Sequence, residues 1–174
     1  MHSKRTTHQS GFSLVEVLVS LVVLSIGMLG VGKLVLFTSR ANDSAYMRSQ
    51  ATALAYTILD SMRANRQTAL TGSYAVAFGA YANPGVSCNT AASACSGTIG
   101  AQYDLYQWKS RLLVALGPTG DGQIVTVSVP DATTGATNVT ASVQVTWNDT
   151  VAQQSFGATG ASAQTAVVIL ESVL

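Results

Sequence analysis

The sequence predicts an α+β fold, in which a long N-terminal helix packs on a small antiparallel sheet with one extra short helix. Two observations support this prediction. An apolar run near the N-terminus leads, with no proline before Pro84, into an amphipathic segment, which is typical of one long helix. The last third of the chain alternates apolar and polar residues between turn signals, which is typical of strands.

The 174-residue chain is poor in charged residues. They make up 10% of it, against about a quarter of an ordinary soluble domain, while hydrophobic residues make up 48%. Nine Lys+Arg and eight Asp+Glu leave a formal net charge of +1. This balance argues against a protein that binds nucleic acid through bulk charge, and the low charge argues against disorder.

The N-terminal segment changes abruptly from basic to apolar. The first ten residues contain two cations, Lys4 and Arg5, and no acid, whereas Phe12 to Val31 contains one charge, Glu16. About twenty helical residues rise roughly 30 Å, which is the thickness of a bilayer core. The sequence therefore predicts a transmembrane helix, and the cations before it predict a cytoplasmic N-terminus.

Two other interpretations of this segment fit less well. A secretory signal peptide has an apolar region of about 7–15 residues and a small-residue cleavage site, but this run is longer and lacks a clear site. A plain membrane anchor leaves Glu16 unexplained, because a charge at the bilayer centre costs at least about 2.5–3.5 kcal/mol. Glu16 is either tolerated near the helix start, where the helix dipole favours an anion, or pairs with a cation in an assembly.

The segment Gly11–Glu16 resembles the cleavage motif of type IV prepilins and pseudopilins. A short basic leader ends in Gly, Phe follows, and Glu lies five residues after the Gly, at the start of a long apolar helix. The resemblance implies that a prepilin peptidase cuts between Gly11 and Phe12 and methylates the new amine of Phe12. It also implies that Glu16 pairs with the terminal amine of a neighbouring subunit. The proline that kinks this helix in many major pilins is missing here.

Beyond Arg40 the chain reads as the amphipathic half of the same helix. Apolar residues recur at helical spacing at Met47, Ala51, Leu54, Ala55, Ile58, Leu59 and Met62. A helix from about Phe12 to about Arg66 would be roughly 80 Å long. The stretch Ala55–Arg66, together with the N-terminal motif, resembles the PilV family of minor pilins, also called type IV pilus modification proteins.

This resemblance implies a pilin-like lollipop built from three parts. Residues 1–11 are the prepilin leader peptide, and residues 12–39 are the transmembrane and assembly half of the helix. Residues 40–174 form a periplasmic globular head that includes the amphipathic half of the helix.

The middle of the chain, residues 67–100, reads as irregular and contains two cysteines, Cys88 and Cys95. In an exported domain an even pair of cysteines predicts a disulfide, worth about 2–3 kcal/mol for so short a loop. A redox pair would lack the C-x-x-C spacing, and a zinc site would lack a nearby histidine. The PilV family also has a cysteine pair in this region.

A second helix and three strands are predicted after this loop. Residues 101–116 place Leu105, Trp108, Leu112 and Leu116 on one helical stripe, and YDLYQWKSRL resembles the matching PilV segment. Strands are expected over 123–129, 139–147 and 163–174. The middle strand alternates cleanly, with its apolar residues at Val139, Ala141, Val143, Val145 and Trp147. We expect an antiparallel meander whose apolar face packs on the long helix.

The sequence lacks the residues of common enzyme sites. Both histidines, His2 and His8, lie in the leader, so cleavage after Gly11 would leave no histidine for nucleophilic catalysis or metal binding. The six aspartates are scattered, and no phosphate-binding Gly-Lys-Ser/Thr motif occurs. We therefore expect no enzyme, no cofactor, no metal and no small-molecule substrate. The arginines at 40, 48, 63 and 66 are expected to form a solvated helix face, with contact to DNA or acidic neighbours as the alternative.

The resemblance implies a minor pilin of the type IV pilus, which acts in pilus assembly or priming and thereby in adhesion or twitching motility. Its expected partners are the prepilin peptidase, other minor and major pilins, the inner-membrane assembly machinery and, before assembly, the lipid bilayer. The expected location is the bacterial inner membrane and then the pilus. The alternatives are a minor pseudopilin of a type II secretion system and a pilus-tip module that binds DNA or a surface.

Overall fold

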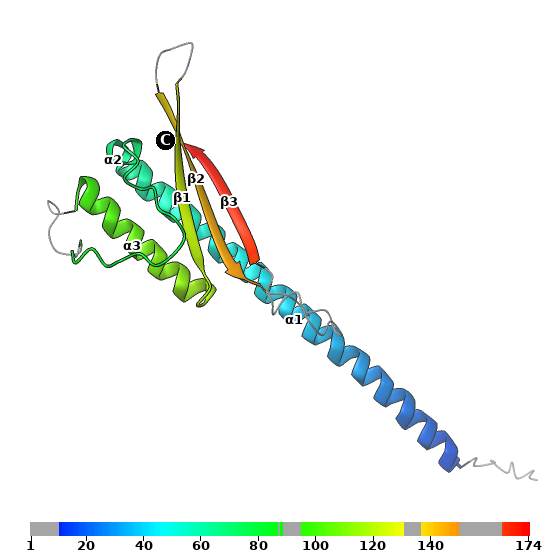
Figure 1. Ribbon diagram of the computed structural model, residues 1–174. Helices are drawn as coiled ribbons and strands as arrows, with labels where there is room; N and C mark the ends of the chain where they lie inside the picture. The colour runs from blue at the N-terminus through cyan, green and yellow to red at the C-terminus, as the bar shows by residue number, and fades with distance from the viewer. Residues whose placement is uncertain (1–10, 87, 89–94, 131–136, 150–164) are drawn as a thin grey trace, which may run out of the picture. The chain divides into compact units, whose positions relative to one another are not determined.

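The computed structural model describes residues 11–86, 88, 95–130, 137–149 and 165–174 (Figure 1). Three helices come first, α1 (Leu14–Ala64), α2 (Arg66–Leu70) and α3 (Gly97–Leu116). Three strands follow, β1 (Asp121–Pro130), β2 (Thr137–Asn148) and β3 (Thr165–Val173). The chain divides into two compact units, of which one ends at Arg40 and the other, here called the head, begins at Ala41. The α+β class predicted from the sequence is confirmed.

The three strands form the predicted antiparallel meander. Their order is β1-β2-β3, so β2 lies in the middle, as Figure 1 shows. The register is unbroken across the sheet, with Ile124 opposite Val143 and Val143 opposite Leu170. Because side chains alternate along a strand, every second residue of β2 points to the same face. The five apolar residues predicted for this face, from Val139 to Trp147, are all buried.

The head is built around one apolar core between the sheet and two helices. The predicted stripe of α1 contributes five buried residues, Ala51, Ala55, Ile58, Leu59 and Met62. Met47 and Leu54 of the same stripe are partly buried and pack against the border of this core. The predicted stripe of α3 is buried throughout, at Leu105, Trp108, Leu112 and Leu116. The apolar spacing of both helices therefore predicted their core faces correctly.

Trp108 is a core residue, and its packing explains one glycine at the start of β1. The indole Nε1 donates a hydrogen bond of 3.0 Å to the carbonyl oxygen of Leu54, which satisfies its polar atom. A Cβ on Gly122 would lie 2.5 Å from the Trp108 ring. Only glycine at this position lets the strand pass so close to the ring.

The stretch expected to be irregular contains more helix than the sequence indicated. After α1 ends at Ala64, the carbonyl oxygen of Asn65 accepts hydrogen bonds from the backbone N–H groups of Thr68 and Ala69, which starts α2. A five-residue helix contains too few turns to show an apolar period, so the pattern could not reveal it. Helix α3 begins at Gly97, four residues before the predicted start, and ends as predicted before Gly117, whose φ is 85°.

Two adjacent leucines of α3 test the assignment of its core face. Leu112 is 0% exposed and Leu113 is 52% exposed. We expect Leu112→Ala to lower the free energy of unfolding by about 2–5 kcal/mol, because it removes buried apolar contacts and leaves a cavity. Leu113→Ala, the matched control, should cost less than about 1 kcal/mol. Urea unfolding in mild detergent, followed by tryptophan fluorescence, measures both, since both tryptophans lie in the head core. Equal costs would contradict the assignment.

Candidate processing and assembly segment

The backbone around Gly11 and Phe12 is exposed and precedes the first turn of α1. Gly11, Phe12 and Ser13 are not helical, and the Phe12 side chain is 83% exposed. The carbonyl oxygen of Ser13 accepts hydrogen bonds from the backbone N–H groups of Glu16 (3.0 Å) and Val17 (3.3 Å). The peptide bond between Gly11 and Phe12 therefore lies outside the helical hydrogen-bond ladder.

Glu16 lies in the first turn of α1, four residues after Phe12. This position places its carboxylate at the positive end of the helix dipole, which favours an anion. The two ion pairs found among the described residues both lie in the head, and Glu16 takes part in neither.

The first part of α1 presents apolar side chains on every side. Among the described residues, α1 is the one helix long and apolar enough to cross a membrane, and the mean hydropathy of its most apolar window is 2.5. A core helix of a soluble protein can have this composition, but its residues are buried, and none in this window is. All large apolar residues from Phe12 to Phe37 are exposed. Apolar surface on this scale indicates contact with lipid or with another chain.

The few polar side chains in this part of α1 are satisfied within the helix. The Ser20 hydroxyl donates to the carbonyl oxygen of Glu16 and the Ser25 hydroxyl to that of Leu21, both at 2.7 Å. The Thr38 hydroxyl does the same toward Leu34 and Val35. Such bonds let a hydroxyl enter an apolar medium without an unpaired donor, so these residues are compatible with a bilayer or a packed fibre core.

The glycines of the apolar segment are open to neighbours. A Cβ placed on Gly27, Gly30 or Gly32 would have no atom within 4 Å. The folding of this chain alone therefore does not require glycine at these positions. Small residues do allow a second helix to approach closely, which is how helices associate in membranes.

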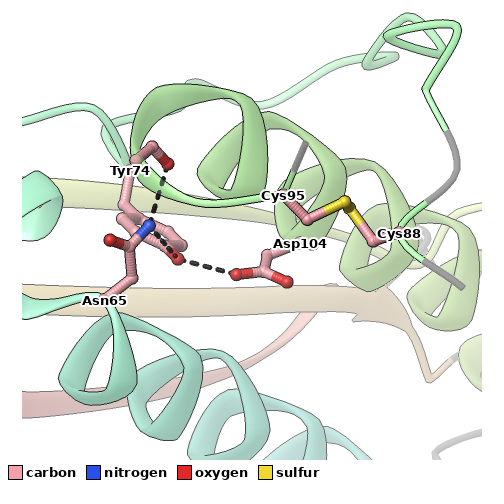
Figure 2. The surroundings of a disulfide bond; sticks show 6 residues. Asn65, Tyr74, Cys88, Cys95 and Asp104 are labelled. Atoms are coloured by element: carbon pink, nitrogen blue, oxygen red, sulfur yellow. Dashed lines mark hydrogen bonds between the residues drawn. A yellow bond between two sulfur atoms is a disulfide. The ribbon is translucent and has the colours of Figure 1, made fainter. Parts of the chain in front are cut away.

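The two cysteines of the head are joined by a disulfide (Figure 2). Cys88 and Cys95 have their Cα atoms 5.4 Å apart and are separated by seven positions in the sequence. The bond closes the loop that enters α3, since Cys95 lies two residues before Gly97. Most of the loop between the cysteines lies outside the described residues.

A polar network beside this disulfide ties three segments together. The buried Tyr74 hydroxyl donates a hydrogen bond of 2.7 Å to the Asp104 carboxylate on α3. Asn65, immediately after α1, donates to the carbonyl oxygen of Gly97 (2.9 Å). Figure 2 shows Asn65, Tyr74 and Asp104 side by side. Burial raises the pKa of Tyr74 well above its ordinary value, and the bond to Asp104 raises it further. Tyr74 is therefore a neutral donor, and the network is structural.

The second polar cluster is a largely buried ion pair between α3 and β1. The Lys109 ammonium lies 2.6 Å from the Asp121 carboxylate and donates to the carbonyl oxygens of Ala77 and Gly79. The same carboxylate accepts hydrogen bonds from the backbone N–H groups of Gly79 and Gly122. Burial alone would raise the pKa of Asp121, but the hydrogen bond from Lys109 and those from the backbone outweigh burial and hold the pKa below its ordinary value.

A cavity of about 450 Å³ opens beside this ion pair. Its lining includes Tyr81, Tyr106 and Leu113 as well as Lys109 and Asp121. The three N–H donors of Lys109 are all used by the protein itself, which leaves no free cation for a ligand. We assign the pair to holding residues 77–79 against α3, and we assign no chemistry to the cavity.

The other charged side chains that the structure describes do not form a further site. Among the described residues, no group of three His, Cys, Asp or Glu side chains is placed to hold a metal ion. Arg63 of α1 donates to the Ser172 hydroxyl (2.9 Å) and Arg66 of α2 to the carbonyl oxygen of Leu174 (3.0 Å), so both helices are connected with the end of β3. Sequence analysis missed these links and the Lys109–Asp121 pair, because folding brings them together from positions without a shared period.

Comparison with known proteins finds a match at the N-terminus. A family model described as "Prokaryotic N-terminal methylation motif" matches residues 6–32, a range that contains Gly11, Phe12 and Glu16. No curated protein and no solved structure gives a significant match to the chain. The match supports a type IV pilin or pseudopilin family protein, whose processing by a prepilin peptidase and assembly with other pilins the motif implies. The apolar helix is consistent with membrane anchoring of such a protein.

The ion pair in the head gives a prediction about stability. We expect Lys109→Ala to lower the free energy of unfolding by about 1–3 kcal/mol, because the Asp121 carboxylate loses its charged partner. Arg111→Ala, on the same helix but exposed, should change it by less than about 0.5 kcal/mol. Urea unfolding of both variants at pH 7 measures the difference.

The pH dependence of the same pair has a defined sign. The pKa of Asp121 is lower in the folded than in the unfolded state, so its stabilisation is present above the unfolded pKa, about 4, and is lost as the pH falls through the folded pKa. The stability difference between the wild type and Asp121→Asn should therefore shrink below about pH 4. A difference that stays constant down to the folded pKa would contradict this role.

Proposed function

We propose that this chain is a minor pilin of the type IV pilus, of the PilV kind. It is inserted in the bacterial inner membrane with a cytoplasmic N-terminus and a periplasmic head, and is later incorporated into the pilus. There it takes part in assembly or priming of the fibre and thereby in adhesion or twitching motility. The observation that supports this most is the coincidence of the matched motif at residues 6–32 with the first part of α1, whose large apolar side chains are all exposed.

The proposed maturation removes residues 1–11 and keeps the apolar segment. A prepilin peptidase hydrolyses the exposed bond between Gly11 and Phe12 and methylates the amine of Phe12. Because the cut precedes the apolar segment, residues 12–39 remain attached to the head, residues 40–174. The same surface then contacts lipid in the precursor and other pilins in the fibre. A signal peptidase would instead separate this segment from the head.

The proposed role of Glu16 is to set the register of the subunit in the fibre. A carboxylate surrounded by apolar side chains is costly, at least about 2.5–3.5 kcal/mol at the centre of a bilayer. A terminal amine of a neighbouring subunit offsets this cost when it pairs with the carboxylate. A subunit displaced along the fibre would leave the carboxylate unpaired, so the pair favours one position over all others.

A minor pseudopilin of a type II secretion system is the second candidate, because the matched motif is common to both machines. Deletion of the gene distinguishes them. Loss of surface pili with normal protein secretion supports the pilus, whereas loss of secretion with normal piliation supports the secretion system. Plasmid-borne wild type should restore the lost property in either case.

Substitution of Gly11 tests the processing step. We expect Gly11→Val to accumulate as the full-length precursor, because a branched side chain replaces the glycine next to the bond that is cut. Gly27→Val should be processed normally, since that position is open and lies in the helix far from the cut. Mass spectrometry of the N-terminus gives the result. A wild-type chain that begins elsewhere than at methylated Phe12 would refute the proposed maturation.

Substitution of Glu16 tests the assembly step. We expect Glu16→Gln to be processed like the wild type but to be depleted at least about tenfold from sheared pili, as expected for the loss of a pair worth about 1.4 kcal/mol or more. Glu171→Gln, on the exposed face of β3, removes the only other glutamate and serves as the control. Immunoblots of membranes and pili compare the variants, and normal incorporation of Glu16→Gln would exclude the pairing.

A further inference from the structure

We propose that the outer edge of β3 binds an extended segment of a neighbouring subunit in the assembled fibre, which adds a strand to the sheet of the head. The contact lies in the first half of β3, at Thr165, Val167 and Ile169. This inference rests on the proposed function, because the partner is a subunit of the same fibre. It assigns to the head a contact that is separate from those of the apolar segment.

The hydrogen-bond pattern of the sheet shows which backbone groups face the outer edge of β3. Strand β3 pairs with β2 along its whole length. The backbone N–H of Leu174 continues this register and donates to the carbonyl oxygen of Val139, 2.9 Å away. Because hydrogen-bonded positions alternate along an antiparallel strand, every second residue from 166 to 172 also bonds to β2. The N–H and C=O groups of the residues between them, such as Val167 and Ile169, therefore point to the outer edge.

No described segment of the chain pairs with this edge. The strand order is β1-β2-β3, and Figure 1 shows β3 as an outermost strand of the sheet. The bridge found outside the named strands among the described residues involves β1 and not β3. At the far end of β3, Arg63 and Arg66 contact Ser172 and Leu174. The open part of the edge is therefore the first half of the strand.

The opposite edge of the sheet, on β1, shows how this head protects an edge. Val76 and Ile124 exchange two backbone hydrogen bonds, of 3.1 and 2.8 Å, and the Gly79 N–H donates to the Asp121 carboxylate. Pro130, which has no N–H, ends the strand. Such features keep an edge from pairing with another chain. The β3 sequence, TAVVILESV, contains no proline, lysine or glycine, and its register has no bulge, so β3 lacks these protections.

The side chains that border the open edge are apolar. Val167 is 41% exposed and Ile169 is 56% exposed. Both lie on the face of the sheet opposite the core, because the residues that alternate with them, Ala166 and Val168, pack in the core. An added strand with apolar residues at alternate positions would bury Val167 and Ile169 through cross-strand pairs.

The chemistry of this edge selects an extended polypeptide as its partner. Its N–H donors and C=O acceptors repeat every second residue, about 6.8 Å apart, and the backbone of another strand matches this spacing. Lipid tails offer no hydrogen-bonding groups, and a helix has already used its own. The matched motif implies assembly with other pilins, so the chain that stays beside the head in the fibre is another subunit.

Residue-resolved amide hydrogen exchange of the full-length chain in detergent tests whether the edge is open before assembly. We expect the amides of Val167 and Ile169 to exchange at least about tenfold faster than those of Val168 and Leu170, since only the latter bond to β2. Equal protection of the two sets would show that the chain itself covers the edge, and the inference would then be wrong.

Photo-crosslinking in sheared pili identifies the partner. A photoreactive residue in place of Ile169 should form adducts with a second subunit, and mass spectrometry of the joined peptides locates the contact. The same residue in place of Val127, which is 51% exposed on β1, should form few adducts and is the matched control. Adducts with lipid alone, adducts within one chain alone, or no excess at position 169 over position 127 would each overturn the inference.

Two substitutions that block strand addition complete the test. Ile169→Pro removes an N–H that β2 does not use, and Ile169→Lys places a charge on the edge. We expect each variant to be incorporated into sheared pili about two- to tenfold less than the wild type, as for the loss of one net hydrogen bond. Val127→Lys should be incorporated normally, and urea unfolding checks that all three variants fold.

The outcomes separate this inference from the proposed function. A folded Ile169→Lys variant that enters pili like the wild type would overturn the strand contact alone, because the chain would still be a pilin. A wild-type chain that is absent from pili would overturn the proposed function and this inference together.

Discussion

The exposed apolar surface between Phe12 and Phe37, most of it on α1, is the constraint on which the rest of this molecule depends. In the head, apolar side chains of α1 are buried by α3 and the sheet, whereas the large apolar side chains described in the first unit are exposed. Exposure of so large an apolar surface to water is unfavourable, so lipid or another protein covers this surface. The position of the cleavage motif before this surface, rather than after it, means that proposed maturation retains it.

Polar interactions, in addition to the apolar core, hold the layers of the head together. The apolar faces of α1, α3 and the sheet meet in one cluster, but several elements carry few apolar residues. Polar links hold these elements instead. The ion pair between Lys109 and Asp121 holds residues 77–79 against α3 and β1. The hydrogen bond from Tyr74 to Asp104 holds the segment after α2 against α3. The disulfide closes the loop before α3. Each link joins a segment without regular structure to an element that the core already fixes.

Sequence analysis predicted the elements of this fold in which apolar residues recur at regular spacing. The apolar spacing from Ala51 to Met62 and the alternation from Val139 to Trp147 identified core faces that are buried in the structure. The α2 helix was missed because five residues show no period, and Lys109 and Asp121 gave no local signal because only folding makes them partners. At the candidate site the residues Gly11, Phe12 and Glu16 came from a motif, whereas the exact helix start came only from the structure.

Glu16 illustrates how one carboxylate can suit two successive environments. Before cleavage the segment has no terminal amine at Phe12. A carboxylate in the first turn of α1 instead interacts favourably with the unpaired N–H groups and the dipole of the helix. These interactions lower the cost of a charge at the edge of an apolar run, which would be much greater at its centre. In the proposed maturation, cleavage then creates an amine at Phe12, and this cation is a stronger partner than a dipole. If the amine belongs to a neighbouring chain, the carboxylate exchanges a partner within its own helix for one in the fibre, and only a processed neighbour can offer that exchange.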